Sequence, residues 1–190
     1  MEFIRKHIEA ISKISDEDWL YFSSRLIERN FSKKTIFLKL GEVENYISFI
    51  KTGIVRFYLP KEFVEKEVTF SFSFKNQFIS AYDSFLTRKP SLYELETLSE
   101  TRMYSISYSD LQDVYANTQF GNLIGRLTAE RLFLLKSKRE QSLLNESAEE
   151  RYLKLFKNRR NFINDIPLKY LSSYIGVTPQ ALSRIRKRIS

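Results

Sequence analysis

The side chains best suited to bind another molecule lie near the C-terminus, between Lys169 and Arg188. Polar residues with the spacing i, i+3, i+4 and i+7 share one face of a helix. Four residues have this spacing: Gln180, Ser183, Arg184 and Lys187. In the major groove of DNA, an Arg side chain pairs with guanine through two hydrogen bonds, and a Gln side chain pairs with adenine. We therefore expect Arg184 to read a guanine and Gln180 to read an adenine.

The same segment holds residues suited to contact phosphate groups or to begin the helix, and such contacts orient a protein on DNA without choosing a sequence. These further DNA-binding candidates are Lys169, Thr178, Pro179, Arg186 and Arg188. Residues 151–190 contain ten Lys and Arg against one acid, while the rest of the chain contains 21 basic and 22 acidic residues. The net charge of +8 therefore resides in the last fifth of the chain, as expected for a protein that binds a polyanion. A solvated charged face explains scattered lysines better than it explains this asymmetry.

A helix-turn-helix would position these side chains. Its small shared core is predicted to contain Leu171, Ile175, Val177, Leu182 and Ile185. Gly176 falls at the turn, where a left-handed backbone conformation costs little only for glycine. Thr178 then predicts an N-cap, with Pro179 in the first turn of the second helix. The second helix is the predicted reader of bases.

The chain before this motif predicts a mixed α+β fold. Ser15 and Asp18 resemble a capping box, so helices are expected in the N-terminal segment. From Phe31 onward β-branched and aromatic runs follow, and the alternation between Val68 and Phe74 predicts a strand with one buried face. Several short strands at such spacing favour an antiparallel β-barrel or jelly roll over a parallel sheet.

Local signals predict further boundaries. Apolar residues at helical spacing run from Trp19 to Ile27, so the helix is expected to reach Ile27. Gly53 is expected to turn one strand into the next. Ser109 predicts the N-cap of a short helix that ends at Tyr115.

The segment from Gly121 to Asn145 contains no proline and predicts a single helix about 37 Å long. One stripe along this helix is expected to meet the same stripe of a second chain. The stripe consists of Ile124, Leu127, Arg131, Leu134 and Lys138. Its polar members make the seam imperfect, and the alternative is a helix packed only against its own barrel. We favour the homodimer, because a helix-turn-helix that reads two half-sites gains affinity from two-fold symmetry.

The composition excludes several classes of function. The sequence has no cysteine, which excludes disulfides, thiolate metal sites and thiol nucleophiles. His7 is the only histidine, which disfavours a Ser-His-Asp triad and a multi-histidine metal site. We therefore expect no catalytic residue, no metal and no cofactor, and we do not expect an enzyme. No apolar run approaches the roughly 18 residues of a transmembrane helix, so a cytoplasmic protein without a membrane partner is expected.

Three stretches of the sequence carry a family resemblance. They are FIKTGIVRFY, QFISAYDSFLTRKPSLYELETLSETRMYSIS, and SAEERYLKLF leading into IPLKYLSSYIGVTPQALSRIRK. In this order they resemble the Crp/Fnr family of bacterial transcription regulators, and the last two resemble the branch found in Bacteroidetes-like bacteria. The resemblance implies a cyclic-nucleotide-binding-like barrel over residues 1–120, a dimerisation helix over 121–146 and a helix-turn-helix domain over 147–190. It implies double-stranded DNA, a second copy of the chain and RNA polymerase as partners.

The effector region departs from the cyclic-AMP-binding pattern of that family. In that pattern a Gly-Glu pair holds the ribose hydroxyl and an Arg-Ser pair neutralises the cyclic phosphate. Here Ser80 and Ala81 stand at the first pair, and Ser91 and Leu92 stand at the second. Burying a phosphate without a paired cation is costly, so we expect that cyclic AMP does not bind and that the effector is another molecule or none.

Other side chains near these positions are candidates for the missing cation or for a different pocket. Arg88 and Lys89 precede Pro90 in a turn that is expected to be exposed, which disfavours either as the missing cation. Aromatic candidates for a different pocket are Phe78, Tyr82, Phe85 and Tyr93, although barrel core is their expected role.

The family resemblance also implies a β-wing after the recognition helix, and none is expected before Ser190. The expected consequence is weaker binding, compensation by the linker residues Lys157, Arg159 and Arg160, or a greater reliance on dimerisation. The sequence as a whole predicts a homodimeric, sequence-specific transcription regulator whose barrel is a sensor or a structural platform. The alternative is a ligand-binding or protein-interaction module whose basic tail binds nucleic acid without choosing a sequence.

Overall fold

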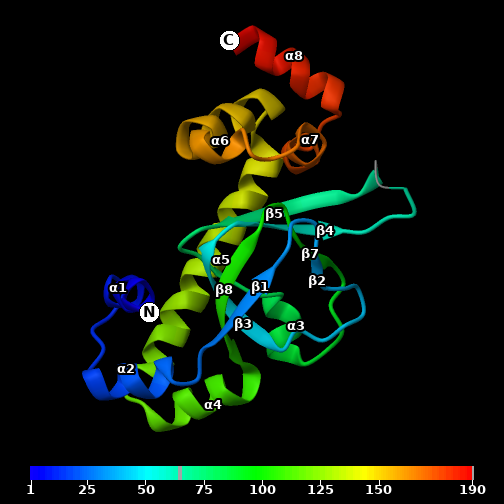
Figure 1. The fold of residues 1–190 in the computed structure, drawn as a ribbon. Helices are drawn as coiled ribbons and strands as arrows, with labels where there is room; N and C mark the ends of the chain where they lie inside the picture. The colour runs from blue at the N-terminus through cyan, green and yellow to red at the C-terminus, as the bar shows by residue number, and fades with distance from the viewer. Residues whose placement is uncertain (64–65, 190) are drawn as a thin grey trace. The chain divides into compact units, whose positions relative to one another are not determined.

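The computed structural model describes residues 1–63 and 66–189, and for residues 158–162 it describes the backbone alone. The helices are α1 (Glu2–Glu9), α2 (Asp16–Ser23), α3 (Tyr82–Thr87), α4 (Tyr108–Asn117), α5 (Gly121–Asn145), α6 (Ala148–Ile163), α7 (Leu168–Ile175) and α8 (Pro179–Ile189). The strands are β1 (Ile27–Phe31), β2 (Ile36–Leu38), β3 (Tyr46–Thr52), β4 (Ile54–Leu59), β5 (Val68–Phe74), β6 (Phe78–Ile79), β7 (Glu94–Thr97) and β8 (Thr101–Ser107). Figure 1 shows these elements coloured along the chain.

The strands form two four-stranded sheets, in the orders β1-β8-β3-β6 and β2-β7-β4-β5. The pairs β1–β8, β3–β8, β3–β6 and β2–β7 are antiparallel. The chain passes repeatedly from one sheet to the other, as it does in a jelly roll. The predicted α+β class, with an antiparallel β domain, a long helix and C-terminal helices, is therefore confirmed. We call the two sheets together the β-roll.

A hydrophobic core joins the N-terminal helices to the sheet that contains β3 and β8. Ile4 and Ile8 of α1 are buried there with Phe49 of β3 and Val114 of α4. The two isoleucines are four residues apart, so they lie on one face of α1. Burying an apolar side chain of this size stabilises a fold by about 1.5–3 kcal/mol, which fixes α1 on the roll.

The turn between β3 and β4 is centred on Gly53, as predicted. Its φ is +110°, a conformation that side-chain-bearing residues rarely adopt. A Cβ atom at this position would lie 2.7 Å from the Cα of Thr101 on the neighbouring strand β8. Close backbone approach therefore requires glycine here.

Several local predictions were wrong at their boundaries. The helix predicted to reach Ile27 ends at Ser23, because Ile27 pairs with Ser105 of β8 and begins β1. The N-cap of α4 is Ser107 rather than Ser109, since the Ser107 hydroxyl accepts the N–H of Asp110 at 3.1 Å.

Two further differences concern helices. The sequence reading had no helix at α3, and α3 places Arg88 at its C-terminal end, with its backbone in the left-handed region. The predicted linker residue Lys157 lies within α6, which continues to Ile163 because no proline or glycine interrupts it. The predicted linker is thus helical.

The strand predicted from the alternation between Val68 and Phe74 is present as β5, but its burial does not alternate as expected. Val68 is 42% exposed, whereas Thr69 on the opposite face is 1% exposed. The residues at the start of β5 contact the C-terminal helices, and this second packing partner overrides the period-2 pattern.

The chain forms two compact units. The first comprises Met1–Arg56 and Phe72–Phe133, and the second comprises Phe57–Ser71 and Leu134–Ser190. The hairpin between β4 and β5 therefore belongs to the same unit as the C-terminal helices, and α5 contributes residues to both units.

Candidate nucleic-acid interface

The helices α7 and α8 form a helix-turn-helix whose turn is centred on Gly176. Its φ is +87°, as the sequence predicted. The N–H of Val177 donates to the carbonyl of Ser172 at 3.0 Å, and the N–H of Gly176 donates to that of Ser173 at 3.1 Å. These two bonds are those of a Schellman motif, which ends a helix and reverses the chain direction.

The start of α8 is capped by Thr178, whose hydroxyl accepts the N–H of Ala181 at 3.2 Å. Pro179 is the first helical residue, where its missing N–H costs no hydrogen bond. The core predicted between the two helices is present, since Leu171, Ile175, Leu182 and Ile185 are all buried. Val177, the fifth predicted member, is half-buried.

The predicted recognition face of α8 is open to solvent. Gln180, Arg184 and Lys187 are exposed, and Ser183 between them is half-buried. Leu182 and Ile185 point the opposite way, into the core with α7. The structure therefore brings together, on one accessible helix face, the side chains that the sequence assigned to base reading.

The candidates for phosphate contact are also exposed. Lys169 on α7 places its Nζ 4.7 Å from the ring centroid of Tyr170. Arg188 forms an ion pair with Glu149 of α6, with Nη2 and Oε2 separated by 2.5 Å. Of the predicted linker residues, Lys157 is exposed on α6, whereas the side chains of Arg159 and Arg160 lie outside the described part of the structure.

Two arginines donate hydrogen bonds to the last carbonyl groups of α7. Neither was among the residues predicted from the sequence. Arg139 of α5 donates to the carbonyl of Tyr174, and its guanidinium lies 4.0 Å from the ring centroid of that tyrosine. Arg151 of α6 donates to the carbonyl of Ile175 at 2.9 Å. Cations are favourable at a helix C-terminus, so these residues fix α7 and with it the adjoining α8. Burial lowers the pKa of Arg139 from its ordinary value of 12.5.

The predicted effector region contains a buried carboxylate and two hydroxyls that are hydrogen-bonded to the chain's own backbone. Glu44 is 5% exposed, and its carboxylate accepts the N–H of Tyr46 at 2.9 Å and that of Ala81 at 3.4 Å. Ser80 and Ser91 donate their hydroxyls to the carbonyls of Tyr46 and Tyr93, at 3.0 and 2.7 Å. A carboxylate thus occupies hydrogen-bond donors that would otherwise be available to an anionic ligand.

Arg88 is not in an exposed turn, in contrast to the sequence prediction. Its guanidinium donates to the carbonyl of Glu44 at 2.7 Å and to the side-chain oxygen of Asn45 at 2.5 Å. The same group lies 4.3 Å from the ring centroid of Tyr108. Arg88 therefore supports the loop around Glu44, and its donors already have acceptors.

The remaining effector-pocket candidates do not converge. Phe78 and Tyr82 pack against the hydrophobic core, and Phe85 is a buried member of it. Tyr93 donates its hydroxyl to Asp83 at 2.5 Å, and burial together with this bond raises the pKa of Tyr93. Leu92 is 71% exposed.

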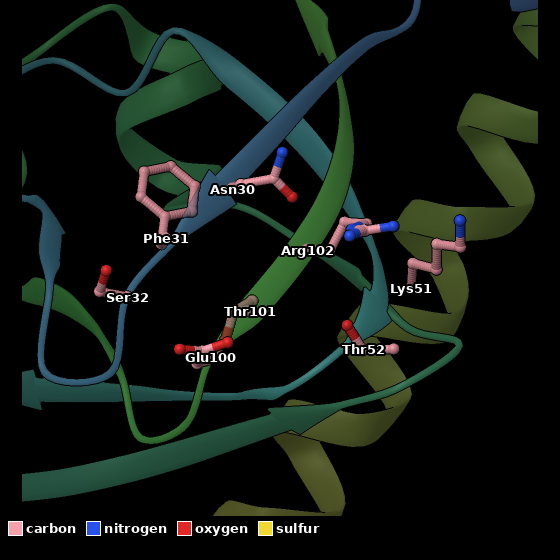
Figure 2. Close-up of a pocket in the computed structure, with 8 residues that line it drawn as sticks. All are labelled: Asn30, Phe31, Ser32, Lys51, Thr52, Glu100, Thr101 and Arg102. Carbon is pink, nitrogen blue, oxygen red and sulfur yellow. The ribbon is translucent and has the colours of Figure 1, made fainter.

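A pocket of about 490 Å³ lies at one end of the β-roll. Its lining consists of Asn30, Phe31, Ser32, Lys51, Thr52, Glu100, Thr101 and Arg102. Figure 2 shows that these residues come from the end of β1, the end of β3 and the start of β8. Arg102 is paired there with Glu28 of β1 at 3.2 Å. None of the effector candidates from the sequence lines this pocket.

The long helix α5 exposes apolar side chains along a row that includes Leu127 and Leu134 of the predicted stripe. Ile124 packs against the hydrophobic core, and Arg131 lies near His7, whose pKa is lowered by burial and by the charge of Arg131. Leu123 is 38% exposed and Leu134 is 57% exposed. With the half-buried Leu127, they form a row spaced by four and seven residues, which we call the α5 row. Lys138 is exposed beyond it.

Residues 1–63 and 66–189 contain neither a metal-binding cluster nor a membrane-spanning helix. In residues 1–63 and 66–189, no three His, Cys, Asp or Glu side chains are grouped as they would need to be to hold a metal ion. Every helix in the part of the chain that the structure describes is too short or too polar to cross a lipid bilayer.

Solved structures share this fold, although no family model and no curated protein matches the chain. The c-di-GMP-responsive global regulator CLP of Xanthomonas campestris matches 92% of this chain over 91% of its own, at 14% identity and a TM-score of 0.68. FixK2 from Bradyrhizobium japonicum matches 86% of this chain over 84% of its own, at 16% identity and a TM-score of 0.70. A protein from Eubacterium rectale, described as a transcriptional regulator of the Crp/Fnr family, matches 92% over 83%, at 17% identity and a TM-score of 0.64. The chain therefore has the fold of Crp/Fnr-type regulators, and the resemblance seen in the sequence is confirmed at the level of the fold.

Proposed function

We propose that this protein is a homodimeric transcription regulator that binds double-stranded DNA at specific sequences through α8. The observation that carries the proposal is the exposed face of Gln180, Arg184 and Lys187 on a helix that is capped, packed and held by its neighbours. A rigid element is needed for base reading, because hydrogen bonds to base edges depend on the position of the donor.

The charge distribution supports the same proposal. Ten Lys and Arg against one acid in residues 151–190 supply the attraction to phosphate on which all DNA binding depends. Lys169, Arg186 and Arg188 are exposed on α7 and α8, where they would orient the recognition face in the groove.

The homodimer is proposed on the α5 row. Leu123 and Leu134 of this row are 38% and 57% exposed, and Phe133 and Leu144, on an adjacent face of the helix, are 71% and 77% exposed. An apolar row of this kind along a 25-residue helix is suited to pack against the same row of a second copy. Two recognition helices related by two-fold symmetry would read two half-sites about 34–36 Å apart. We also propose RNA polymerase as a partner, because the family resemblance implies it. No surface of the chain is assigned to that contact.

We also propose that the β-roll does not bind cyclic AMP. The cation that the cyclic phosphate needs is missing at Ser91, and the guanidinium of Arg88 is held by protein acceptors. The negative charge of Glu44 beside Ala81 would repel a phosphate placed there. Titration calorimetry with the full chain tests this point: no heat of binding is expected, and a micromolar affinity would contradict it. CLP is described as responsive to c-di-GMP, and that nucleotide would be the second ligand in the same titration.

A competitor titration tests the DNA-binding proposal against the alternative, a module whose basic residues bind nucleic acid without choosing a sequence. A labelled duplex that the protein retains is challenged with random duplex and with unlabelled copies of itself. Specific regulators prefer their site by roughly a thousandfold or more over random DNA. Equal competition by both duplexes would favour the non-specific module.

A further inference from the structure

Ser173, on the first helix of the helix-turn-helix, is hydrogen-bonded to the β4–β5 hairpin. Its hydroxyl donates to the carbonyl of Glu67 at 2.9 Å. It also accepts the backbone N–H of Thr69 at 2.9 Å. All three residues belong to the same compact unit, so this contact lies inside a single body of the structure.

The chemistry of the contact follows from the place of β5 in its sheet. The strand β5 stands at the end of the order β2-β7-β4-β5, so it is an edge strand among the strands that the structure describes. Along an edge strand, alternate residues present their N–H and C=O groups on the open side. Glu67 and Thr69 are two positions apart and present such a pair. A serine hydroxyl is both donor and acceptor, so one side chain satisfies both backbone groups.

This contact is different in origin from the other attachments of α7. Arg139 and Arg151 reach α7 from α5 and α6, which precede it directly in the chain. The hairpin comes from a distant part of the sequence, and its strands continue into the β-roll. Ser173 therefore hydrogen-bonds the start of β5 to the helix-turn-helix.

The contact leaves the recognition face of α8 accessible. Gln180, Arg184 and Lys187 are exposed while Ser173 is bound to β5. The attachment consequently holds the helix-turn-helix in place without covering the surface that would contact bases. A protein element that is ordered before binding loses less conformational entropy when it binds, and its affinity is higher.

We propose that the edge of β5 is a support for the helix-turn-helix, and that Ser173 is a positioning residue which raises DNA affinity by fixing α7 on that edge. The inference rests on the proposed function, and it specifies how the β-roll affects DNA binding. A change in the hairpin would reach α8 through this attachment, without any contact between the hairpin and DNA.

The test compares Ser173→Ala, which removes the hydroxyl, with Ser173→Thr, which keeps it. Ser24→Ala is the matched control, because Ser24 is an exposed helix-end serine whose hydroxyl bonds only to the carbonyl of Tyr21 among the contacts described. Amide exchange of the full chain without DNA reports on the N–H of Thr69. Fluorescence anisotropy with a retained duplex reports on affinity.

Ser173→Ala is expected to speed the exchange of the Thr69 amide and to weaken DNA binding by about threefold to tenfold, as expected for the loss of one or two hydrogen bonds. Ser173→Thr and Ser24→Ala are expected to leave both quantities near the wild-type values. An unchanged Thr69 exchange rate in Ser173→Ala would overturn the attachment itself. Equal losses in the Ala and Thr variants would assign the effect to packing and overturn the role of the hydroxyl. If wild-type protein retains no duplex, the proposed function fails, and the exchange measurement still decides the attachment.

Discussion

At the scale of single residues, Arg184 and Arg188 are given different roles on the same helix. Arg184 lies on the recognition face and is assigned to a base, whereas Arg188 lies in the last turn and is assigned to a phosphate. Arg184→Ala is expected to relax the preference at one base pair per half-site, where a bidentate contact is worth about 1–3 kcal/mol of discrimination. Arg188→Ala is expected to weaken binding to all sequences alike and to lower the salt slope by about one. Binding-site selection and salt titration measure the two effects, and an unchanged motif for Arg184→Ala would remove its assignment.

Glu149 gives a second prediction at this scale. Its carboxylate pairs with Arg188 at 2.5 Å, and a phosphate would have to compete for that guanidinium. Exposed ion pairs are worth about 0–1 kcal/mol, so Glu149→Gln should raise DNA affinity by up to about fivefold. The gain should shrink when Arg188 is already Ala, which a double-mutant cycle on DNA affinity measures. The same gain in both backgrounds would mean that Glu149 acts through overall charge rather than through Arg188.

The buried carboxylate of Glu44 makes a prediction about pH. Burial raises its pKa above the ordinary value of 4.5, against the opposing hydrogen bonds from the N–H groups of Tyr46 and Ala81. A raised pKa in the folded state means that the protonated form favours folding. The contribution is fully present below the unfolded value and is lost as the pH rises through the folded value.

Glu44→Gln carries no charge at any pH and is the comparison for this effect. The free energy of unfolding of the wild type should therefore increase relative to that of Glu44→Gln as the pH falls from 7 to about 4. Urea denaturation of both proteins across this range measures the difference. A difference that does not vary with pH would show that Glu44 has the same pKa folded and unfolded.

The shared helix face of the proposed recognition residues could be predicted from the sequence, whereas the residues that hold the helices in place could not. Gln180 and Arg184 follow a helical spacing that is visible in a single segment. Arg139, Ser173 and Glu67 come from separate segments, and only tertiary packing brings them together. The same reason explains why Glu44 did not emerge as a neighbour of Ala81.

At the scale of elements, α5 supports the prediction that concerns assembly. Leu134→Glu places a charge in the α5 row and is expected to shift the protein from dimer to monomer at micromolar concentration, since a buried unpaired charge is costly. Sedimentation velocity measures the shift. Leu20→Glu is the matched control, because Leu20 is 69% exposed on α2, away from α5 in the sequence. A dimer that survives Leu134→Glu would assign the interface to another surface.

The helix ends that depend on residues nearby in the sequence were predicted correctly. The capping side chain of Ser15 accepts the N–H of Asp18 at 3.1 Å, and α5 spans the predicted Gly121–Asn145. The start of β1 and the helix α3 were missed, because sheet pairing and packing decide them rather than local preference. The face of α5 that packs on the core also depends on tertiary structure, and Ile124, a member of the predicted stripe, packs against that core.

At the scale of the whole molecule, the excess positive charge and the helix-turn-helix lie in the same C-terminal part of the chain. The basic residues are concentrated in the C-terminal fifth of the chain, and the β-roll that precedes it is close to electrically neutral. The chain has the fold of Crp/Fnr-type regulators, with a β4–β5 hairpin hydrogen-bonded to α7. The division into residues 1–120, 121–146 and 147–190 stays a proposal, since the hairpin belongs with the C-terminal unit.

Two copies of this chain are proposed to read two DNA half-sites through α8, and the selection of bound fragments from random duplex DNA by the wild-type protein tests this. The enriched fragments are expected to contain an inverted repeat whose half-sites are about one helical turn, 10–10.5 base pairs, or a multiple of this distance apart from centre to centre. Recovery of fragments without a shared motif would contradict it and would reduce the C-terminal helices to a non-specific anchor.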